Sequence, residues 1–289
     1  MKASLLYKSE CKLGEGPMWS EKRNSCLWVD IDGNGFYEYN WRTAEVKQWE
    51  VEQKISLIVE AKDGKLILGM ENGLAAFDTE TNVLNWLIDI ERNISTNRSN
   101  DGACDVAGRL WIGTMAKDFT PHKGSLYCIE KDMSVIKKLD KLTISNGLTW
   151  SLDNSRMYFI DSTTQCVQCF LFDAEKAEIR FEKIVIEIDK KLGTPDGMTI
   201  DEEGMLWIAH YNGFAVGRWD PATGKLLEKI ELPVPQVTSC AFGGENLDNL
   251  IITTAREKMK EEDLKKYPDS GNIFIAKTNV KGVTRFRFG

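Results

Sequence analysis

The chain has 289 residues, of which 42% are hydrophobic and 28% are charged, and its formal net charge is −7 at pH 7. This composition is typical of a globular protein with a substantial core, and the negative charge argues against nucleic acids and anionic membranes as partners. The N-terminal apolar stretch is too short for a signal peptide, and no segment reaches the apolar length of a transmembrane helix. We therefore expect a cytoplasmic protein.

Six times along the chain, a short polar step leads into an apolar strand. The steps are spaced 41 to 50 residues apart and lie near Glu15, Ser56, Asn100, Asn146, Asp196 and Ser239. The strands that follow contain, in the same order, Trp28, Ile67, Trp111, Tyr158, Trp207 and Ile251. A repeat of this length built from short strands is typical of propeller blades. Because no linker rich in proline or serine interrupts it, we predict one all-β domain, a six-bladed β-propeller over residues 1–289.

Within a repeat, turns and short apolar runs alternate. Residues 63–79 run from Asp-Gly through an apolar stretch to a second turn and a second apolar stretch, and residues 107–127 and 203–219 repeat this order. Such a pattern indicates a β-meander. We expect Leu110–Ile112 and Leu206–Ile208 to be innermost strands, because a strand flanked on both sides is continuously apolar.

The two ends of the chain and one charged segment stand apart from the repeat. A ring must protect its first and last edges, so we expect residues 4–11 and 282–288 to share one blade. Residues 255–267 carry opposite charges four positions apart, which predicts a short solvated helix between strands of the last blade. We assign that helix no function.

The seven cysteines are odd in number, and most of them lie in apolar strand contexts. This usage indicates buried, reduced thiols in a cytoplasmic protein. Cys166 and Cys169 form a CxxC, but neither a helix start nor a second CxxC accompanies them, so we expect both to be structural.

Four of the six steps carry an oxygen-bearing side chain at a matched position of the repeat: Glu15, Asn100, Asn146 and Asp196. Equivalent positions of a propeller converge on its axis, so we expect these side chains in a central metal-binding channel. Carboxylate and amide oxygens form a hard site that suits calcium, magnesium or manganese. Zinc is less natural without a His or Cys partner. The alternative is that Asn-Gly and Asp-Gly are only turns.

Other catalytic designs find little support in the sequence. The only two histidines, His122 and His210, lack a Gly-x-Ser-x-Gly elbow or a cysteine partner, which argues against a catalytic triad. No glycine-rich phosphate loop precedes a helix. His210 follows an apolar strand, where it either reaches the channel mouth or packs at the strand end.

Six motifs, which span nearly the whole chain in order, carry a family resemblance. They are Gly14–Pro17, Arg98–Gly102, Gly113–Met115, Ile144–Leu148, Pro195–Met198 and Thr238–Gly244. As a set they resemble the gluconolactonase / senescence-marker-protein (regucalcin) / luciferin-regenerating-enzyme family. The resemblance implies a six-bladed propeller with one divalent metal ion on its axis, and hydrolysis of sugar lactones.

Carried over by position, the resemblance implies that Glu15, Asn146 and Asp196 are the protein ligands of the metal. Arg98 and Asn100 would hold the hydroxyl groups of the substrate, with Asn100 also near the metal. Each of these residues lies inside one of the matching motifs.

The resemblance also raises the questions of proton transfer and of specificity. Asp196 is the first candidate to accept the proton of the attacking water, although a ligating carboxylate is a weak base, and Asp101 is the second. Animal members of the family carry a substrate-contacting Glu at the position of Asp118, and Lys117 replaces an acidic neighbour. Because Asp is one carbon shorter, we expect a different sugar preference.

We therefore predict a metal-dependent sugar lactonase that uses one divalent ion (Ca, Mn, Mg or Zn) and no organic cofactor. The metal would polarise the lactone carbonyl for attack by water. Two alternatives stay open, namely a non-enzymatic calcium-binding or regulatory propeller, and a metal-dependent esterase or phosphotriesterase. The partner would be a small sugar lactone, and we expect a monomer or a weak homodimer.

Overall fold

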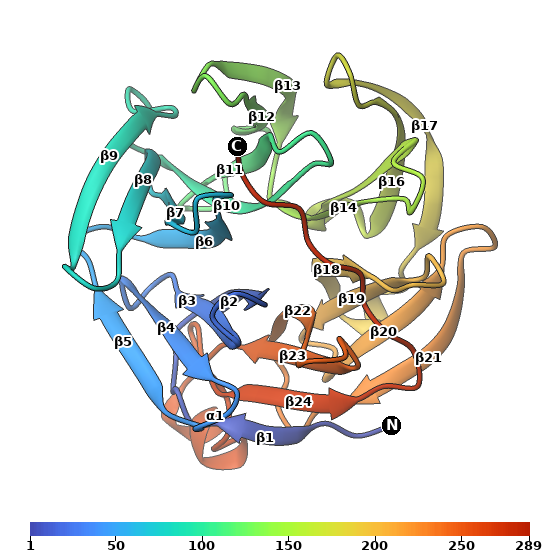
Figure 1. Ribbon diagram of the computed structural model, residues 1–289. Coiled ribbons are helices and arrows are strands. Elements are labelled where there is room, and N and C mark those ends of the chain that lie inside the picture. Colours follow the sequence, from blue (N-terminus) through green and yellow to red (C-terminus); the bar gives the residue numbers. More distant parts are fainter.

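Turns divide the chain into 24 short strands. Several turn positions adopt the left-handed backbone conformation that asparagine and glycine tolerate, such as Asn24 and Gly64 with φ of +48° and +90°. In the computed structural model, which describes residues 1–289, the strands form six four-stranded antiparallel sheets arranged in a ring around a central axis (Figure 1). The predicted six-bladed β-propeller is therefore confirmed.

In the first three blades the strands pair in chain order. Blade 1 consists of β2 (Gly14–Ser20), β3 (Ser25–Asp30), β4 (Gly35–Asn40) and β5 (Val46–Glu50). Blade 2 consists of β6 (Ile55–Glu60), β7 (Leu66–Met70), β8 (Gly73–Asp78) and β9 (Val83–Asp89). Blade 3 consists of β10 (Asn97–Cys104), β11 (Leu110–Ala116), β12 (Gly124–Ile129) and β13 (Val135–Leu142).

The next two blades repeat this order, and the last one differs. Blade 4 consists of β14 (Ser145–Trp150), β15 (Arg156–Asp161), β16 (Cys166–Asp173) and β17 (Glu178–Glu187). Blade 5 consists of β18 (Thr194–Ile200), β19 (Leu206–Tyr211), β20 (Ala215–Asp220) and β21 (Lys225–Glu231). Blade 6 combines β22 (Val237–Gly243), β23 (Asn249–Thr254) and β24 (Ile273–Lys277) with β1 (Ser4–Tyr7).

The strand next to the channel is the one that carries the polar step. β2, β6, β10, β14, β18 and β22 begin the six sheets and contact one another around the axis. The prediction that Leu110–Ile112 and Leu206–Ile208 are innermost is therefore wrong, because both lie in second strands, β11 and β19. Second strands are apolar because they pack between neighbouring blades, where Trp111 and Trp207 are fully buried.

The N-terminal strand closes the ring. β1 pairs with β24 as the outermost strand of blade 6, with Ser4 opposite Ile275. The closure predicted from residues 4–11 and 282–288 is thus correct for the N-terminal run and wrong for the C-terminal one. Since β1 already covers the edge of β24, no edge is free for residues 282–288. They cross one face of the ring instead, as the red segment in Figure 1 shows.

Every innermost strand bulges at its polar step. The pairing register shifts between Glu15 and Met18, Ile55 and Leu57, Ser99 and Gly102, Asn146 and Leu148, Pro195 and Met198, and Val237 and Ser239. A bulge adds local twist and redirects the side chains beside it. The same irregularity therefore occurs at the same place in all six blades, next to the channel.

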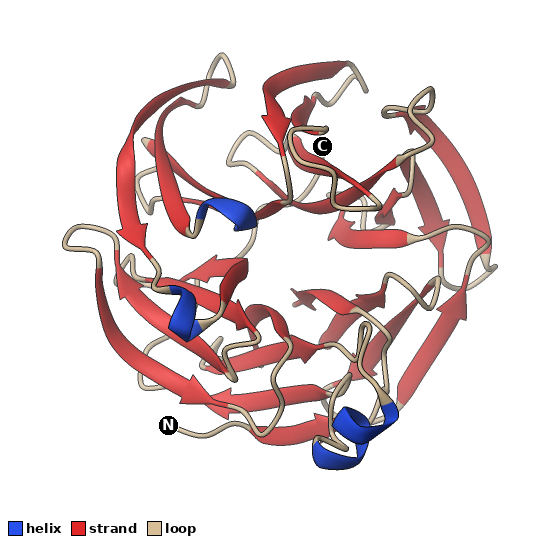
Figure 2. Cartoon of the chain, turned by 180° about the vertical axis from the view of Figure 1, so that it is seen from behind, coloured by secondary structure: helices blue, strands red, loops and turns tan.

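The two faces of the ring differ. The innermost strands begin at one face, which we call the mouth face. It carries the 3₁₀ turns η1 (Ser162–Thr164) and η2 (Lys190–Leu192) and the helix α1 (Glu261–Lys266), shown in blue in Figure 2. The predicted helix is thus confirmed but shorter, and residues 256–260 form a loop before it. We call residues 279–289, which cross the other face, the C-terminal strap. No helix in the structure has the length and apolarity to cross a membrane.

Two buried tryptophans between the blades, Trp111 and Trp207, are anchored by buried carboxylates. Trp111 Nε1 donates to Asp105 Oδ2 at 3.0 Å, and Trp207 Nε1 donates to Asp201 Oδ2 at 2.9 Å. Both acids are fully buried and both pair with an arginine. Because a buried polar atom without a partner costs about 1–3 kcal/mol, these bonds fix the orientation of the indoles in the core.

Candidate metal and substrate site

Two buried carboxylates fix the chain just before the site. Asp161, at the end of β15, accepts hydrogen bonds from the backbone amides of Thr143 and Ile144 at 2.8 and 3.0 Å. Asp30, at the end of β3, accepts from the amides of residues 12–13 at 3.0 and 2.9 Å. These bonds hold the starts of β14 and β2, the innermost strands that carry Asn146 and Glu15.

The two channel asparagines have fixed amide orientations. Asn146 Nδ2 donates to Ser162 Oγ at 2.8 Å, which leaves Oδ1 as the atom available to the channel. Asn100 Nδ2 donates to this Oδ1 at 3.2 Å and to the carbonyl oxygen of Ser145 at 2.8 Å. Arg98 Nη1 donates to Asn100 Oδ1 at 2.6 Å. Each amide group therefore has one orientation that satisfies its neighbours.

Two buried carboxylates, Glu15 and Asp196, lie close enough for the charge of Glu15 to raise the pKa of Asp196. Burial, followed by the negative charge of Asp101, raises the pKa of Glu15 to about 8. Burial and then the charge of Glu15 raise the pKa of Asp196 well above its ordinary value. Glu15 accepts one hydrogen bond, from the amide of Gly16 at 2.9 Å, whereas Asp196 accepts none. A buried carboxylate without a donor is unstable as an anion unless a cation is close.

Asp101 and Arg98 complete the charged groups of the cluster. Asp101 accepts a hydrogen bond from the amide of Gly102 at 2.7 Å, and burial raises its pKa to about 6. Arg98 is buried, which lowers its pKa, and it faces the carboxylates of Glu15 and Asp196 among others. The structure thus brings together the five positions Glu15, Arg98, Asn100, Asn146 and Asp196, with Asp101 beside them.

The donor set fits a hard divalent cation. It offers the carboxylates of Glu15 and Asp196 and the amide Oδ1 of Asn146, and the positive charge of Arg98 acts on both carboxylates. Oxygen donors of this kind suit calcium, magnesium or manganese. No group of three or more His, Cys, Asp or Glu side chains is arranged for metal binding anywhere in the structure.

Loops from opposite blades meet above the mouth. Phe119, in the loop after β11 of blade 3, lies under Lys258, in the loop after β23 of blade 6, with Nζ 4.0 Å from the ring centroid. Beside Lys258, Glu257 accepts a hydrogen bond from Tyr211 Oη at 3.4 Å, and its charge raises the pKa of Asp196. Sequence analysis missed Glu257 because the charged run around it resembled a solvated helix.

Asp118 is not part of the buried cluster. It is exposed on the same loop as Phe119 and accepts a hydrogen bond from the amide of Thr120 at 3.0 Å. The hydroxyl of Thr120, followed by this amide, lowers the pKa of Asp118. Its role toward a substrate therefore stays a prediction, although the loop that carries it lies at the mouth.

His210 and the CxxC cysteines are buried, whereas His122 is not. His210 is buried, stacks on Trp219 with ring centroids 5.9 Å apart, and accepts a hydrogen bond from Trp219 Nε1 at 3.2 Å. His122 is exposed in a loop. All seven cysteines are free and buried, as predicted. Cys166 and Cys169 lie three positions apart in β16 and therefore point to opposite faces of the sheet.

Comparison with known proteins identifies the family. The SMP-30/Gluconolactonase/LRE-like region matches residues 13–256, which cover most of the ring. The chain belongs to this family. A regucalcin from Gallus gallus is 37% identical over 283 residues, which are 96% of this chain and 95% of that protein. The resemblance inferred from the six motifs is thereby confirmed.

Solved structures agree with this assignment. A luciferin-regenerating enzyme superposes on the chain with a TM-score of 0.91 at 31% identity, and the match covers 96% of both chains. A regucalcin from Agrobacterium tumefaciens, described as a calcium-binding protein, superposes with a TM-score of 0.95 at 27% identity over 100% of this chain and 97% of that one. The propeller and its family membership therefore rest on both sequence and structure.

Proposed function

We propose that this protein opens sugar lactones by hydrolysis, with a divalent metal ion held by Glu15, Asn146 and Asp196. The main support for this proposal is that two buried carboxylates and an oriented amide oxygen lie beside a buried arginine. Membership of a family named for gluconolactonase supports this reaction class. The description of a relative as a calcium-binding protein supports a divalent ion.

Arg98 and Asn100 would position the substrate. Arg98 uses only Nη1 for its two hydrogen bonds, to Ser99 O at 2.9 Å and to Asn100 Oδ1, so its Nη2 and Nε atoms can donate to ring hydroxyls. Asn100, held by Arg98 and by Ser145, keeps its amide in place while a ring binds. Prearranged donors orient a polyhydroxylated ring at little entropic cost.

The chemistry supplied by a bound divalent ion is polarisation of the lactone carbonyl and stabilisation of the oxyanion. The protein must provide the acceptor for the proton of the attacking water. Asp196 is the first candidate and lies in the cluster without a hydrogen-bond donor. Asp101 is the second candidate, and its pKa of about 6 suits a base that works near neutral pH.

Two further proposals concern specificity and setting. The exposed carboxylate of Asp118, on the loop at the mouth, would contact the substrate and shift the sugar preference.

The free thiols of all seven cysteines support a reducing, cytoplasmic compartment. We propose a monomer or a weak homodimer there, with a small sugar lactone as its partner.

A calcium-binding protein without catalysis is the second candidate function, because a relative is described in those terms. Arg98 and Asn100 distinguish the two functions, since a site that only binds metal does not need a guanidinium aimed at the same pocket. A metal-dependent esterase or phosphotriesterase would use the same groups on another substrate.

The test is acid release from D-glucono-1,5-lactone in unbuffered solution, with the chelated protein and with manganese, calcium or zinc added back. We expect activity only with metal, and a loss of activity in Arg98→Met with metal affinity retained. Metal binding without any turnover on a panel of aldonolactones would favour the non-enzymatic function. Full turnover after exhaustive chelation would contradict the proposed metal site.

A further inference from the structure

The channel contains a second compartment, which opens toward the face that the C-terminal strap crosses. It is a cavity of about 200 Å³, and 16 of its 30 lining residues are hydrophobic. All six innermost strands contribute to its wall, but Glu15, Asn146 and Asp196 do not line it. Asp101 belongs to the wall between this cavity and the mouth site. The cavity is therefore a separate space with a mostly apolar surface.

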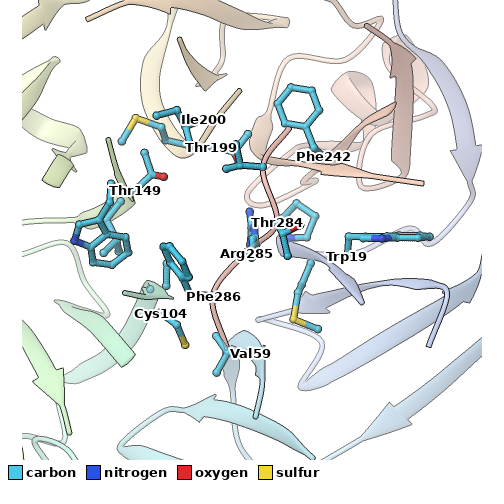
Figure 3. A pocket seen from close by; sticks show the side chains of 18 of the residues that line it. Trp19, Val59, Cys104, Thr149, Thr199, Ile200, Phe242, Thr284, Arg285 and Phe286 are labelled. Carbon is cyan, nitrogen blue, oxygen red and sulfur yellow. The ribbon is translucent and has the colours of Figure 1, made fainter. Parts of the chain in front are cut away.

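The C-terminal strap delivers an arginine to this cavity. On one side of Arg285, the amide of Gly282 donates to the carbonyl oxygen of Leu247 at 2.7 Å. On the other side, the amide of Phe288 donates to the carbonyl oxygen of Glu60 at 3.0 Å. Figure 3 shows Arg285 near the centre of the lining side chains. The strap is thus tied at both ends and holds Arg285 at the axis of the ring.

Arg285 is the one charged side chain of the cavity that has no partner. Arg287 pairs with Glu60 at 3.1 Å, and Glu21 accepts a hydrogen bond from Thr284 at 3.1 Å. Arg285 makes no hydrogen bond and no ion pair, and Asp101 is the carboxylate that acts on it most strongly through space.

The neighbouring thiols do not neutralise Arg285. Burial raises the pKa of Cys26 and of Cys240 to about 12, so both stay uncharged. The side chain of Arg285 keeps solvent-accessible surface and lies among the residues that line the cavity (Figure 3). A guanidinium has five N–H donors in a fork that matches a carboxylate, and all of them are available here.

We propose that this cavity is a second ligand site, and that it binds a small monocarboxylic acid through its carboxylate on Arg285 and its apolar body on the surrounding side chains. The lining side chains include Trp19, Phe242 and Phe286, labelled in Figure 3, and their rings offer flat apolar surfaces. If each non-hydrogen atom of a ligand takes roughly 20–30 Å³, the cavity accepts an acid of about seven to ten non-hydrogen atoms.

The charges of the cavity favour a monoanion over a dianion. Only one cation is unpaired, and Asp101 lies in the same wall, so a second negative charge on the ligand would be repelled. The mostly apolar lining also disfavours inorganic phosphate, which has no apolar surface to bury. The preferred ligand class is therefore an aromatic or aliphatic acid with one carboxylate.

The experiment is calorimetric titration of the full chain, in low-chloride buffer, with benzoate, benzamide and inorganic phosphate. We expect benzoate to bind, with benzamide and phosphate at least tenfold weaker. Arg285→Met should weaken benzoate binding at least tenfold, and Arg285→Lys should keep more of it. Arg180→Gln, which removes an exposed arginine from β17, should leave binding unchanged and serves as the matched control.

The location and the folding of the variants are checked in parallel. Asp196→Asn should bind benzoate like the wild type, since Asp196 does not line the cavity. Thermal unfolding should show that Arg285→Met is folded, because the side chain of Arg285 has no hydrogen bond or ion pair that the substitution would break. The proposal is overturned if benzoate does not bind, if benzamide binds equally well, if Arg285→Met binds like the wild type, or if Asp196→Asn abolishes binding.

Discussion

Asn100 and Asn146 lie 46 positions apart in the chain, yet the Nδ2 of the first donates to the Oδ1 of the second across neighbouring blades at 3.2 Å. The bond links the residue proposed to hold the substrate with one proposed to hold the metal. Because Ser162 Oγ accepts from the Nδ2 of Asn146 while Asn100 donates to its Oδ1, the amide of Asn146 is held in one orientation. One hydrogen-bonded chain therefore orients both functions.

Replacing Asp196 with Asn should abolish metal binding and lower kcat/KM by at least about 10²-fold, the scale seen when a charge-stabilising group is lost. The fold should survive, because the change removes repulsion between two buried carboxylates. Calorimetry with manganese and calcium, together with the lactone assay, measures both effects. Asp153→Asn, in an exposed turn, is the control. Wild-type metal affinity in Asp196→Asn would rule out its role as a ligand.

The metal-free protein should lose stability as the pH rises. Burial raises the pKa of Glu15 from 4.5 to about 8, so the native state binds this proton more tightly than the unfolded chain. Its contribution is complete below the unfolded-state pKa and is lost as the pH passes through about 8. We expect the Tm of the chelated protein to fall between about pH 5 and about pH 8.5, and Glu15→Gln to flatten this slope. A Tm that rises over this range in parallel for both proteins would contradict the assignment.

Added divalent metal should reverse this trend, because binding requires both carboxylates to be ionised and releases their protons. The rise in Tm caused by calcium or manganese should therefore be larger at about pH 8 than at about pH 5. Differential scanning fluorimetry at matched metal concentrations measures it. An equal shift at both pH values would mean that the metal binds elsewhere.

Asp161→Ala should weaken metal binding, although Asp161 is not one of the proposed metal ligands. It removes the acceptor for the amides of Thr143 and Ile144 and so loosens the start of β14 before Asn146. We expect a loss of about 1–3 kcal/mol in unfolding free energy. Metal affinity should also fall, because a ligand on a looser strand is less well placed. Asp153→Ala in the same blade should leave metal affinity unchanged, and an effect on stability alone in Asp161→Ala would restrict Asp161 to a structural role.

The contact between Phe119 and Lys258 should hold the mouth loops together. Exposed cation–π pairs contribute about 0.5–1 kcal/mol, so Phe119→Ala or Lys258→Met should raise KM about two- to fivefold. The value of kcat should stay near that of the wild type, since neither residue belongs to the buried cluster. If the two side chains act only through their contact with each other, the KM of the double variant should be no higher than that of either single variant. Additive increases in KM would show that the two residues act separately.

Much of the fold was predictable because it depends on short-range signals. The polar steps and their spacing identified six blades, and the matched positions of Glu15, Asn100, Asn146 and Asp196 indicated that they converge. The choice of innermost strand was wrong because apolarity alone does not separate a strand at the axis from one packed between two blades. Trp111 and Trp207 belong to the second kind.

The sequence by itself therefore determined the repeat, the family and the identity of the polar side chains on the axis, since turns and strand polarity are encoded within a few residues. Only the tertiary structure decided which atoms of those side chains face the channel. It also decided that Phe119 meets Lys258 and that Arg285 enters the ring from the far face. These contacts join segments from different blades or from the end of the chain, and no local pattern encodes which of them meet once the ring closes.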